Sequence, residues 1–117
     1  MATHELVVKP GYRLVINVTF GSPQWENRVR LQDYISGVDV GERNSRTNGN
    51  GAIITPENTS SQVKLYLLHA EHRSLGWFHN LSKTLFQSEF NVFYAFEDGG
   101  DSNYNDATAN VSFERVS

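Results

Sequence analysis

The chain has 117 residues, with ten Lys and Arg against 13 Asp and Glu, and its formal net charge is −3 at pH 7. This length predicts one domain over residues 1–117, and the acidic balance argues against a nucleic-acid or anionic-membrane partner, since both need a basic face. The absence of Cys excludes disulfides, thiolate zinc sites and Cys nucleophiles, and no apolar run approaches the ~18 residues of a membrane-spanning helix.

The first residues contain no basic segment followed by an apolar one. No secretory signal is therefore evident, and we expect a protein that is cytoplasmic as synthesised and does not insert into membranes. Export or cell-surface display by a route without such a signal stays open as an alternative.

Alternating apolar residues predict an all-β chain. In residues 12–20, Leu14, Ile16 and Val18 fall on one face, which is the period-two pattern of a half-buried strand. Further strands are expected at 27–32, 52–55, 62–69, 90–96 and 107–116. Residues 36–51 give a weak pattern, 71–74 are expected to form a turn, and 77–81 with 83–86 fit two short strands or one irregular segment. The pattern predicts an antiparallel β-sandwich of about nine strands with Greek-key connections.

Residues 97–106 form an acidic segment between two predicted strands, and so a loop at one end of the sandwich. Its carboxylates and carboxamides belong to Glu97, Asp98, Asp101, Asn103, Asn105 and Asp106. Two central glycines allow the backbone to fold tightly enough for these side chains to converge. A solvated turn is the alternative, since acidic Gly- and Asn-rich loops are common between strands.

Converging carboxylates favour a bound cation. Each close pair repels by about 1 kcal/mol in water and about 4 kcal/mol at an effective dielectric near 20. The ligand set is oxygen only, which selects hard cations, and a flexible loop favours calcium over magnesium. The spacing differs from the EF-hand pattern.

The run from Glu97 to Ala107, followed by an alternating strand to the C-terminus, resembles the signature of the calcium-mediated bacterial fucose- and mannose-binding lectins of the LecB type. Chain length, the early strand at 12–21 and the hairpin at 60–74 agree in pattern. The resemblance implies a non-catalytic, calcium-dependent lectin that coordinates vicinal sugar hydroxyls through two calcium ions per subunit. It also implies a homodimer or tetramer with a glycan as its partner.

The resemblance further implies a role for each matching position. Around the first ion it places Glu97, Asp101, Asn103 and Asp106. Around the second it places Asn103, Asp106, the side chain of Asn105, the backbone carbonyl of Gly21 and the C-terminal carboxylate of Ser117 from a partner subunit. It makes Asp98 an acceptor for sugar hydroxyls and assigns the monosaccharide preference to Ser22, Pro23 and Gln24.

Three departures from the family pattern weaken the implied site. Asn103 stands where the family has a bridging Asp, so we expect weaker calcium binding or a single ion. The tail is one residue longer, which puts the reach of the Ser117 carboxylate in doubt. Pro23 lacks the backbone N–H that the family can offer to the sugar.

Other residues allow alternative sites. His69, His72 and His79 with Glu71 could bind a metal, but on a strand His69 and Glu71 share a face and His72 lies opposite, which favours surface histidines. Trp77 is expected to pack in the core or an interface, whereas Trp25 fits either packing or sugar stacking. For Arg28 and Arg30 we expect a solvated face or a subunit contact.

The main alternative to the lectin hypothesis is a metal-free structural or protein-interaction sandwich descended from such a lectin. A small glycosidase is a third hypothesis, because two loop carboxylates could flank a glycosidic bond. We do not expect an enzyme, since nothing in the sequence supplies the long cleft that such enzymes need.

Overall fold

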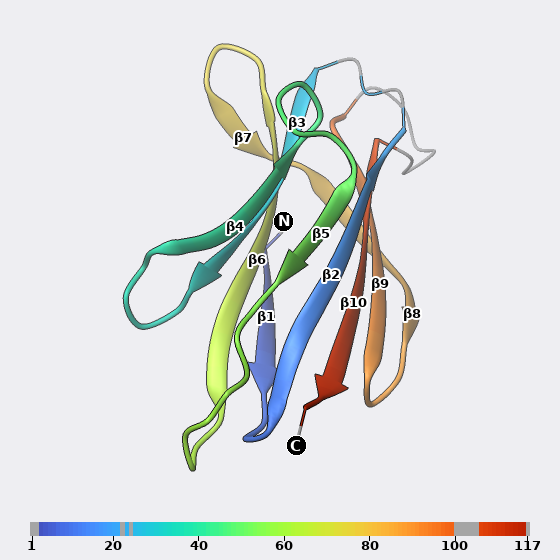
Figure 1. Ribbon diagram of the computed structural model, residues 1–117. Helices are drawn as coiled ribbons and strands as arrows, with labels where there is room; N and C mark the ends of the chain where they lie inside the picture. The colour runs from blue at the N-terminus through green and yellow to red at the C-terminus, as the bar shows by residue number, and fades with distance from the viewer. Residues whose placement is uncertain (1–2, 22, 24, 100–105, 117) are drawn as a thin grey trace.

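The structure is a computed structural model of the chain, and it describes residues 3–21, 23, 25–99 and 106–116. These residues form ten strands and no helix (Figure 1). The strands are β1 (Thr3–Val8), β2 (Tyr12–Phe20), β3 (Glu26–Asp33), β4 (Asp39–Asn44), β5 (Gly51–Ile54), β6 (Lys64–Arg73), β7 (Trp77–His79), β8 (Leu81–Gln87), β9 (Asn91–Glu97) and β10 (Ala107–Arg115). Within the described ranges, then, nothing could cross a lipid bilayer as a helix.

Two antiparallel sheets make up the sandwich. One has the strand order β1-β6-β3-β4, with β7 pairing with the C-terminal end of β6, and the other has the order β5-β2-β10-β9-β8. The chain passes between the two sheets several times. Strands far apart in sequence therefore become neighbours; for example, β2 pairs with β10. This arrangement confirms the predicted antiparallel sandwich, with one strand more in the described residues than the nine expected.

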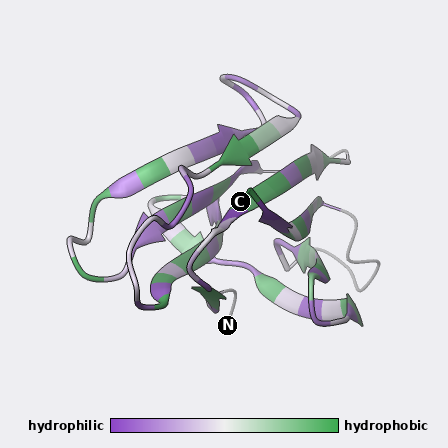
Figure 2. Ribbon diagram, turned by 60° about the horizontal axis from the view of Figure 1, so that its bottom comes forward, coloured by the Kyte–Doolittle hydropathy of each residue, from purple (hydrophilic) through white to green (hydrophobic). Residues whose placement is uncertain are grey.

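The core lies between the sheets and follows the predicted alternation. Leu14, Ile16 and Val18 of β2 are buried, as are Val29 and Leu31 of β3 on the opposite sheet. Figure 2 shows hydrophobic and hydrophilic residues alternating along the strands. Burying one face of each strand in this way fixes the register, because a slip by one residue would turn the apolar set to solvent.

Three details differ from the sequence-based expectation. β1 and β4 were not predicted; β1 buries only Leu6 and Val8 of its apolar residues, and β4 carries mostly charged and small residues. The turn expected at 71–74 is wrong, because β6 continues to Arg73 and pairs there with both β3 and β7. The segment left open at 77–86 forms two strands in different sheets, with the buried Asn80 between them.

β4 and β5 close one side of the sandwich, where they contact each other. A Cβ atom on Gly41 would lie 2.6 Å from Cγ2 of Ile53, a buried side chain of the core. We expect Gly41→Ala to lower the free energy of unfolding by about 1–3 kcal/mol, because overpacking forces the neighbouring backbone to shift. Urea denaturation measures the change. Gly76→Ala, where a Cβ meets nothing within 4 Å, is the matched control; equal effects of the two substitutions would contradict the packing argument.

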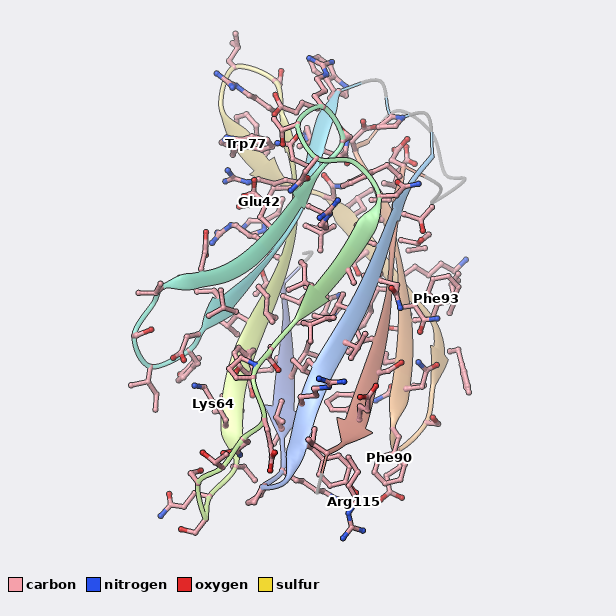
Figure 3. All side chains as sticks on the ribbon, viewed as in Figure 1. Glu42, Lys64, Trp77, Phe90, Phe93 and Arg115 are labelled. Carbon is pink, nitrogen blue, oxygen red and sulfur yellow. The ribbon has the colours of Figure 1, made fainter. Side chains whose placement is uncertain are left out.

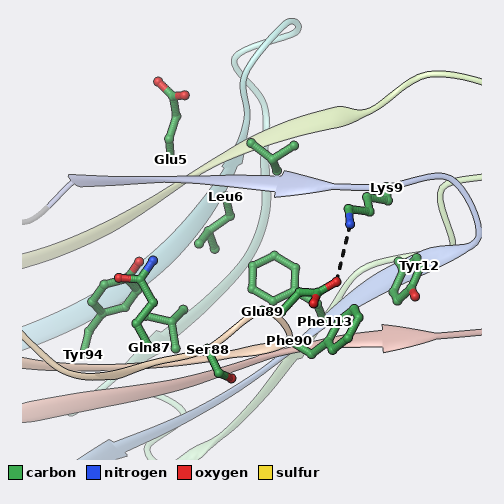
Figure 4. A pocket seen from close by; sticks show the side chains of 12 residues that line it. Glu5, Leu6, Lys9, Tyr12, Gln87, Ser88, Glu89, Phe90, Tyr94 and Phe113 are labelled. Carbon is green, nitrogen blue, oxygen red and sulfur yellow. Dashed lines mark ion pairs between the residues drawn. The ribbon is translucent and has the colours of Figure 1, made fainter.

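The opposite side, between β1 and the β8–β9 turn, contains a cavity of about 190 Å³ (Figure 4). The near-parallel rings of Tyr12 and Phe90 lie 5.8 Å apart in its wall, and Lys9 and Glu89 form an ion pair of 3.8 Å beside them. Tyr12 begins β2, whereas Gly21 follows the last residue of that strand. The cavity therefore lies at the end of the sandwich opposite Gly21.

Candidate functional site

Three carboxylates of the predicted site converge at one end of the sandwich. Glu97 is the last residue of β9, Asp98 follows it, and Asp106 directly precedes β10. One carboxylate oxygen from each lies within 4.8 Å of the other two, and all three residues are buried. Among the described residues this is the one such group of three or more Asp, Glu, His or Cys side chains.

The pairing of β9 with β10 explains why the cluster forms. Phe96 is paired with Ala107, and the Asp106 N–H donates to the Phe96 carbonyl over 3.2 Å. The loop between the strands therefore starts and ends at one point. The Asp98 N–H then donates to Oδ2 of Asp106 over 2.9 Å, which fixes the two residues relative to each other.

The segment after β2 lies against this cluster. The Gly21 N–H donates to the Asp106 carbonyl over 3.2 Å, and the Trp25 N–H donates to Oδ2 of Asp98 over 3.4 Å. Thus Gly21 and Trp25 lie beside two of the predicted site residues, with the half-buried Pro23 in the same segment. That the Gly21 carbonyl binds an ion, and that Pro23 influences sugar choice, remain predictions.

The three carboxylates are crowded in a buried position. Burial raises the pKa of Asp106 to about 7, the Asp98 N–H opposes this rise, and the nearby carboxyl groups of Glu97 and Asp98 add to it. A cation between these oxygens would remove the repulsion, which is the chemistry expected of a site for a hard, oxygen-preferring ion. The donor set of the three residues therefore fits calcium.

The remaining predicted ligands fall outside the described residues. These are Asp101, Asn103, Asn105 and Ser117 of the ion sites, and Ser22 and Gln24 of the sugar loop. Their roles stay predictions.

The other candidate sites are engaged in contacts of their own. Glu71 accepts from Nε of both Arg28 and Arg30, over 2.9 and 2.8 Å, and the Arg28 guanidinium lies 3.8 Å from the ring centroid of Trp77. His69 shares the outer face with Glu71 as predicted, and Gln32 Oε1 lies 2.8 Å from its Nε2.

His72 points to the opposite face, where it reaches a residue that sequence reasoning missed. Its Nδ1 lies 2.7 Å from Oδ1 of Asn80, which in turn contacts Asn27. Asn27 occupies an inward position of β3, two residues before the core residue Val29. Asn27 lies on the same face of β3 as the core residues Val29 and Leu31. An amide side chain on a face that the alternation assigns to the core is the sequence signal that could have pointed to a buried polar contact there.

Two solved structures of bacterial lectins share this fold. The high-affinity mannose-binding lectin of Ralstonia solanacearum aligns at a TM-score of 0.57 and 12% identity, over 92% of each chain. The C-terminal domain of the BC2L-C lectin from Burkholderia cenocepacia aligns at a TM-score of 0.59 and 12% identity, over 92% of this chain and 91% of that one. No protein-family model and no curated protein sequence matches the chain. At this identity the likeness establishes the fold alone.

Proposed function

We propose that the protein is a non-catalytic, calcium-dependent lectin that recognises fucose- or mannose-type sugars. The observation that carries this proposal is the buried trio Glu97, Asp98 and Asp106 at the sandwich end, at the positions that the lectin resemblance assigns to calcium and sugar. The two structural neighbours, one of them titled a mannose-binding lectin, support it through their shared fold.

In this proposal Glu97 and Asp106 hold calcium together with the loop residues Asp101, Asn103 and Asn105. The Gly21 carbonyl and the Ser117 carboxylate of a second copy would complete the shell of a second ion. With Asn103 in place of a bridging carboxylate, either one ion or two weakly held ions bind. The bound cation supplies positive charge to which two vicinal sugar hydroxyls can coordinate in place of water.

The chain's own residues then orient the sugar. Asp98 accepts hydrogen bonds from its hydroxyls, and a carboxylate acceptor makes such bonds roughly twice as strong as neutral ones. In this proposal Ser22, Pro23 and Gln24 set the monosaccharide preference. A dimer or tetramer would add avidity on a multivalent glycan surface, because the second binding event becomes intramolecular.

The melting temperature in EDTA, in millimolar calcium, and in calcium with methyl mannoside or methyl fucoside tests the proposal. An ion at about 100 times its dissociation constant adds roughly 2.7 kcal/mol to the free energy of unfolding, which raises the melting temperature by several degrees. We expect the calcium shift to be reversed by chelator and a further shift with one of the sugars. Magnesium is the control and should give little shift, because it loses its water reluctantly.

The result also decides between the lectin and the metal-free sandwich. An unchanged melting temperature in calcium would overturn the metal site and favour a structural or protein-interaction role, as the substitution at Asn103 allows. A calcium shift with no further shift from any sugar would retain the ion and overturn the lectin.

A further inference from the structure

A chain of buried amides connects the acidic cluster to His72 on β6. Asn27 on β3 and Asn80 between β7 and β8 are 0% and 1% exposed. Nδ2 of Asn27 lies 3.4 Å from Oδ2 of Asp98, Nδ2 of Asn80 lies 2.8 Å from Oδ1 of Asn27, and Nδ1 of His72 lies 2.7 Å from Oδ1 of Asn80. Three elements distant in sequence thus meet behind Asp98.

All the bonds in this chain run in one direction. An amide oxygen can only accept, so His72 donates through Nδ1 to Asn80, Asn80 donates to Asn27, and Asn27 donates to the Asp98 carboxylate. Each amide therefore accepts through its oxygen from the His72 side and donates through its nitrogen toward the acidic cluster. At the Asp98 end, the amide N–H of Asn27 therefore faces a carboxylate, whose negative charge favours a hydrogen-bond donor.

Asn27 also holds the neighbouring loop. Its Nδ2 donates to the Trp25 carbonyl over 2.9 Å, while the Trp25 N–H donates to Asp98. One buried amide thus links Asp98 to the segment that precedes β3. Burying an amide is costly unless its hydrogen bonds are made, so this linkage fixes one arrangement of the two parts and penalises others.

We propose that Asn27 and Asn80 are positioning residues for sugar recognition, with His72 as the donor that orients Asn80. This inference rests on the proposed function, in which Asp98 accepts hydrogen bonds from the sugar. Glu97 and Asp106 are the cluster members assigned to calcium, and Asn27 bonds to Asp98 instead. The amide chain therefore affects the affinity for sugar more than the affinity for the ion.

A matched pair at His72 provides the first test, because this residue is only half-buried. His72→Leu removes the donor to Asn80, whereas His72→Asn keeps an N–H donor close to the position of Nδ1. By calorimetry we expect His72→Leu to raise the sugar dissociation constant three- to tenfold and to leave the calcium dissociation constant within twofold. We expect His72→Asn to restore most of the sugar affinity, which a loss of packing alone would not allow.

Asn80→Ala breaks the chain at its centre, and Asn58→Ala is its control. Asn58 is equally an interior amide, 6% exposed, but it donates to the Val8 and Gln62 carbonyls near the opposite end of the sandwich. Both variants should unfold at lower temperature. We expect only Asn80→Ala to raise the sugar dissociation constant, by tenfold or more. Equal sugar affinities in the two variants, or parallel losses for sugar and calcium in Asn80→Ala, would overturn the inference.

Hydrogen exchange of the Trp25 amide in calcium, without sugar, separates this inference from the proposed function. We expect faster exchange in Asn80→Ala and wild-type exchange in Asn58→Ala, since the Trp25 N–H donates to Asp98. Unchanged exchange in Asn80→Ala overturns the positioning role even where the wild type binds sugar. A wild-type chain that binds no sugar overturns the lectin function, and faster exchange in Asn80→Ala would still support the positioning of Asp98.

Discussion

Replacing Asp106 with asparagine is expected to weaken calcium binding at least a hundredfold and to stabilise the metal-free protein. The substitution removes one carboxylate from the buried trio but keeps an oxygen that can accept from the Asp98 N–H. With calcium the lost charge costs about 2.8 kcal/mol or more of binding free energy. Without calcium the same change removes a carboxyl group whose pKa is raised to about 7 by burial and, to a smaller extent, by the nearby carboxyl groups of Glu97 and Asp98.

Asp106→Asn is therefore expected to weaken calcium binding in calcium buffer and to raise the free energy of unfolding in EDTA. Calorimetry gives the calcium dissociation constant, and urea denaturation in EDTA gives the free energy of unfolding. Asp39→Asn is the matched control, because it makes the same chemical change on β4, where Asp39 pairs with Arg30. Wild-type calcium affinity in Asp106→Asn, or an equal loss in Asp39→Asn, would show that the trio is not the ion site.

The core strands could be predicted because their alternation is regular. β2 and β10 bury alternate residues over most of their length, and β9 does so over residues 91–94, so periodicity identifies them without knowledge of their partners. β4 could not be predicted in this way, because Gly41, which has no side chain, is the residue that lies against the core residue Ile53. The strand therefore shows no alternation of apolar side chains. The polar run at 71–74 predicts a turn, but Glu71 lies within β6. Its two arginine partners, which come from β3, explain its burial.

In the candidate site, too, contacts between residues close in sequence could be predicted, whereas contacts between distant strands could not. Glu97, Asp98 and Asp106 could be predicted to converge, because they lie at the two ends of the connection between the adjacent strands β9 and β10. The contact of Asn27 with Asn80 depends on the chain crossing between the sheets at Asn80, which no local pattern encodes. The residues that converge at the cluster can thus be found from sequence, whereas the residues that contact the cluster from other strands can be found only from the fold.

Without metal, the wild-type protein is expected to lose stability relative to Asp106→Asn as the pH rises from 4 to 7. The Asp106 carboxyl has its pKa raised from 3.8 to about 7, so in this window the folded state binds the proton more often than the unfolded state. Each rise in pH there favours unfolding. About three pKa units correspond to a ceiling of about 4 kcal/mol. Urea denaturation of both proteins in EDTA, at a series of pH values, measures the difference.

The difference between the two proteins is the informative quantity, because other groups oppose the trend. Burial lowers the pKa of His4, and burial together with the Arg30 charge lowers that of His69, so the folded protein gains stability as these residues become neutral. These contributions are common to wild type and variant and cancel, since asparagine does not titrate. A difference that stays constant from pH 4 to pH 7 would contradict the raised pKa. In saturating calcium, the stability of the wild type relative to Asp106→Asn should instead increase as the pH rises, because the ion competes with the proton for the same oxygens.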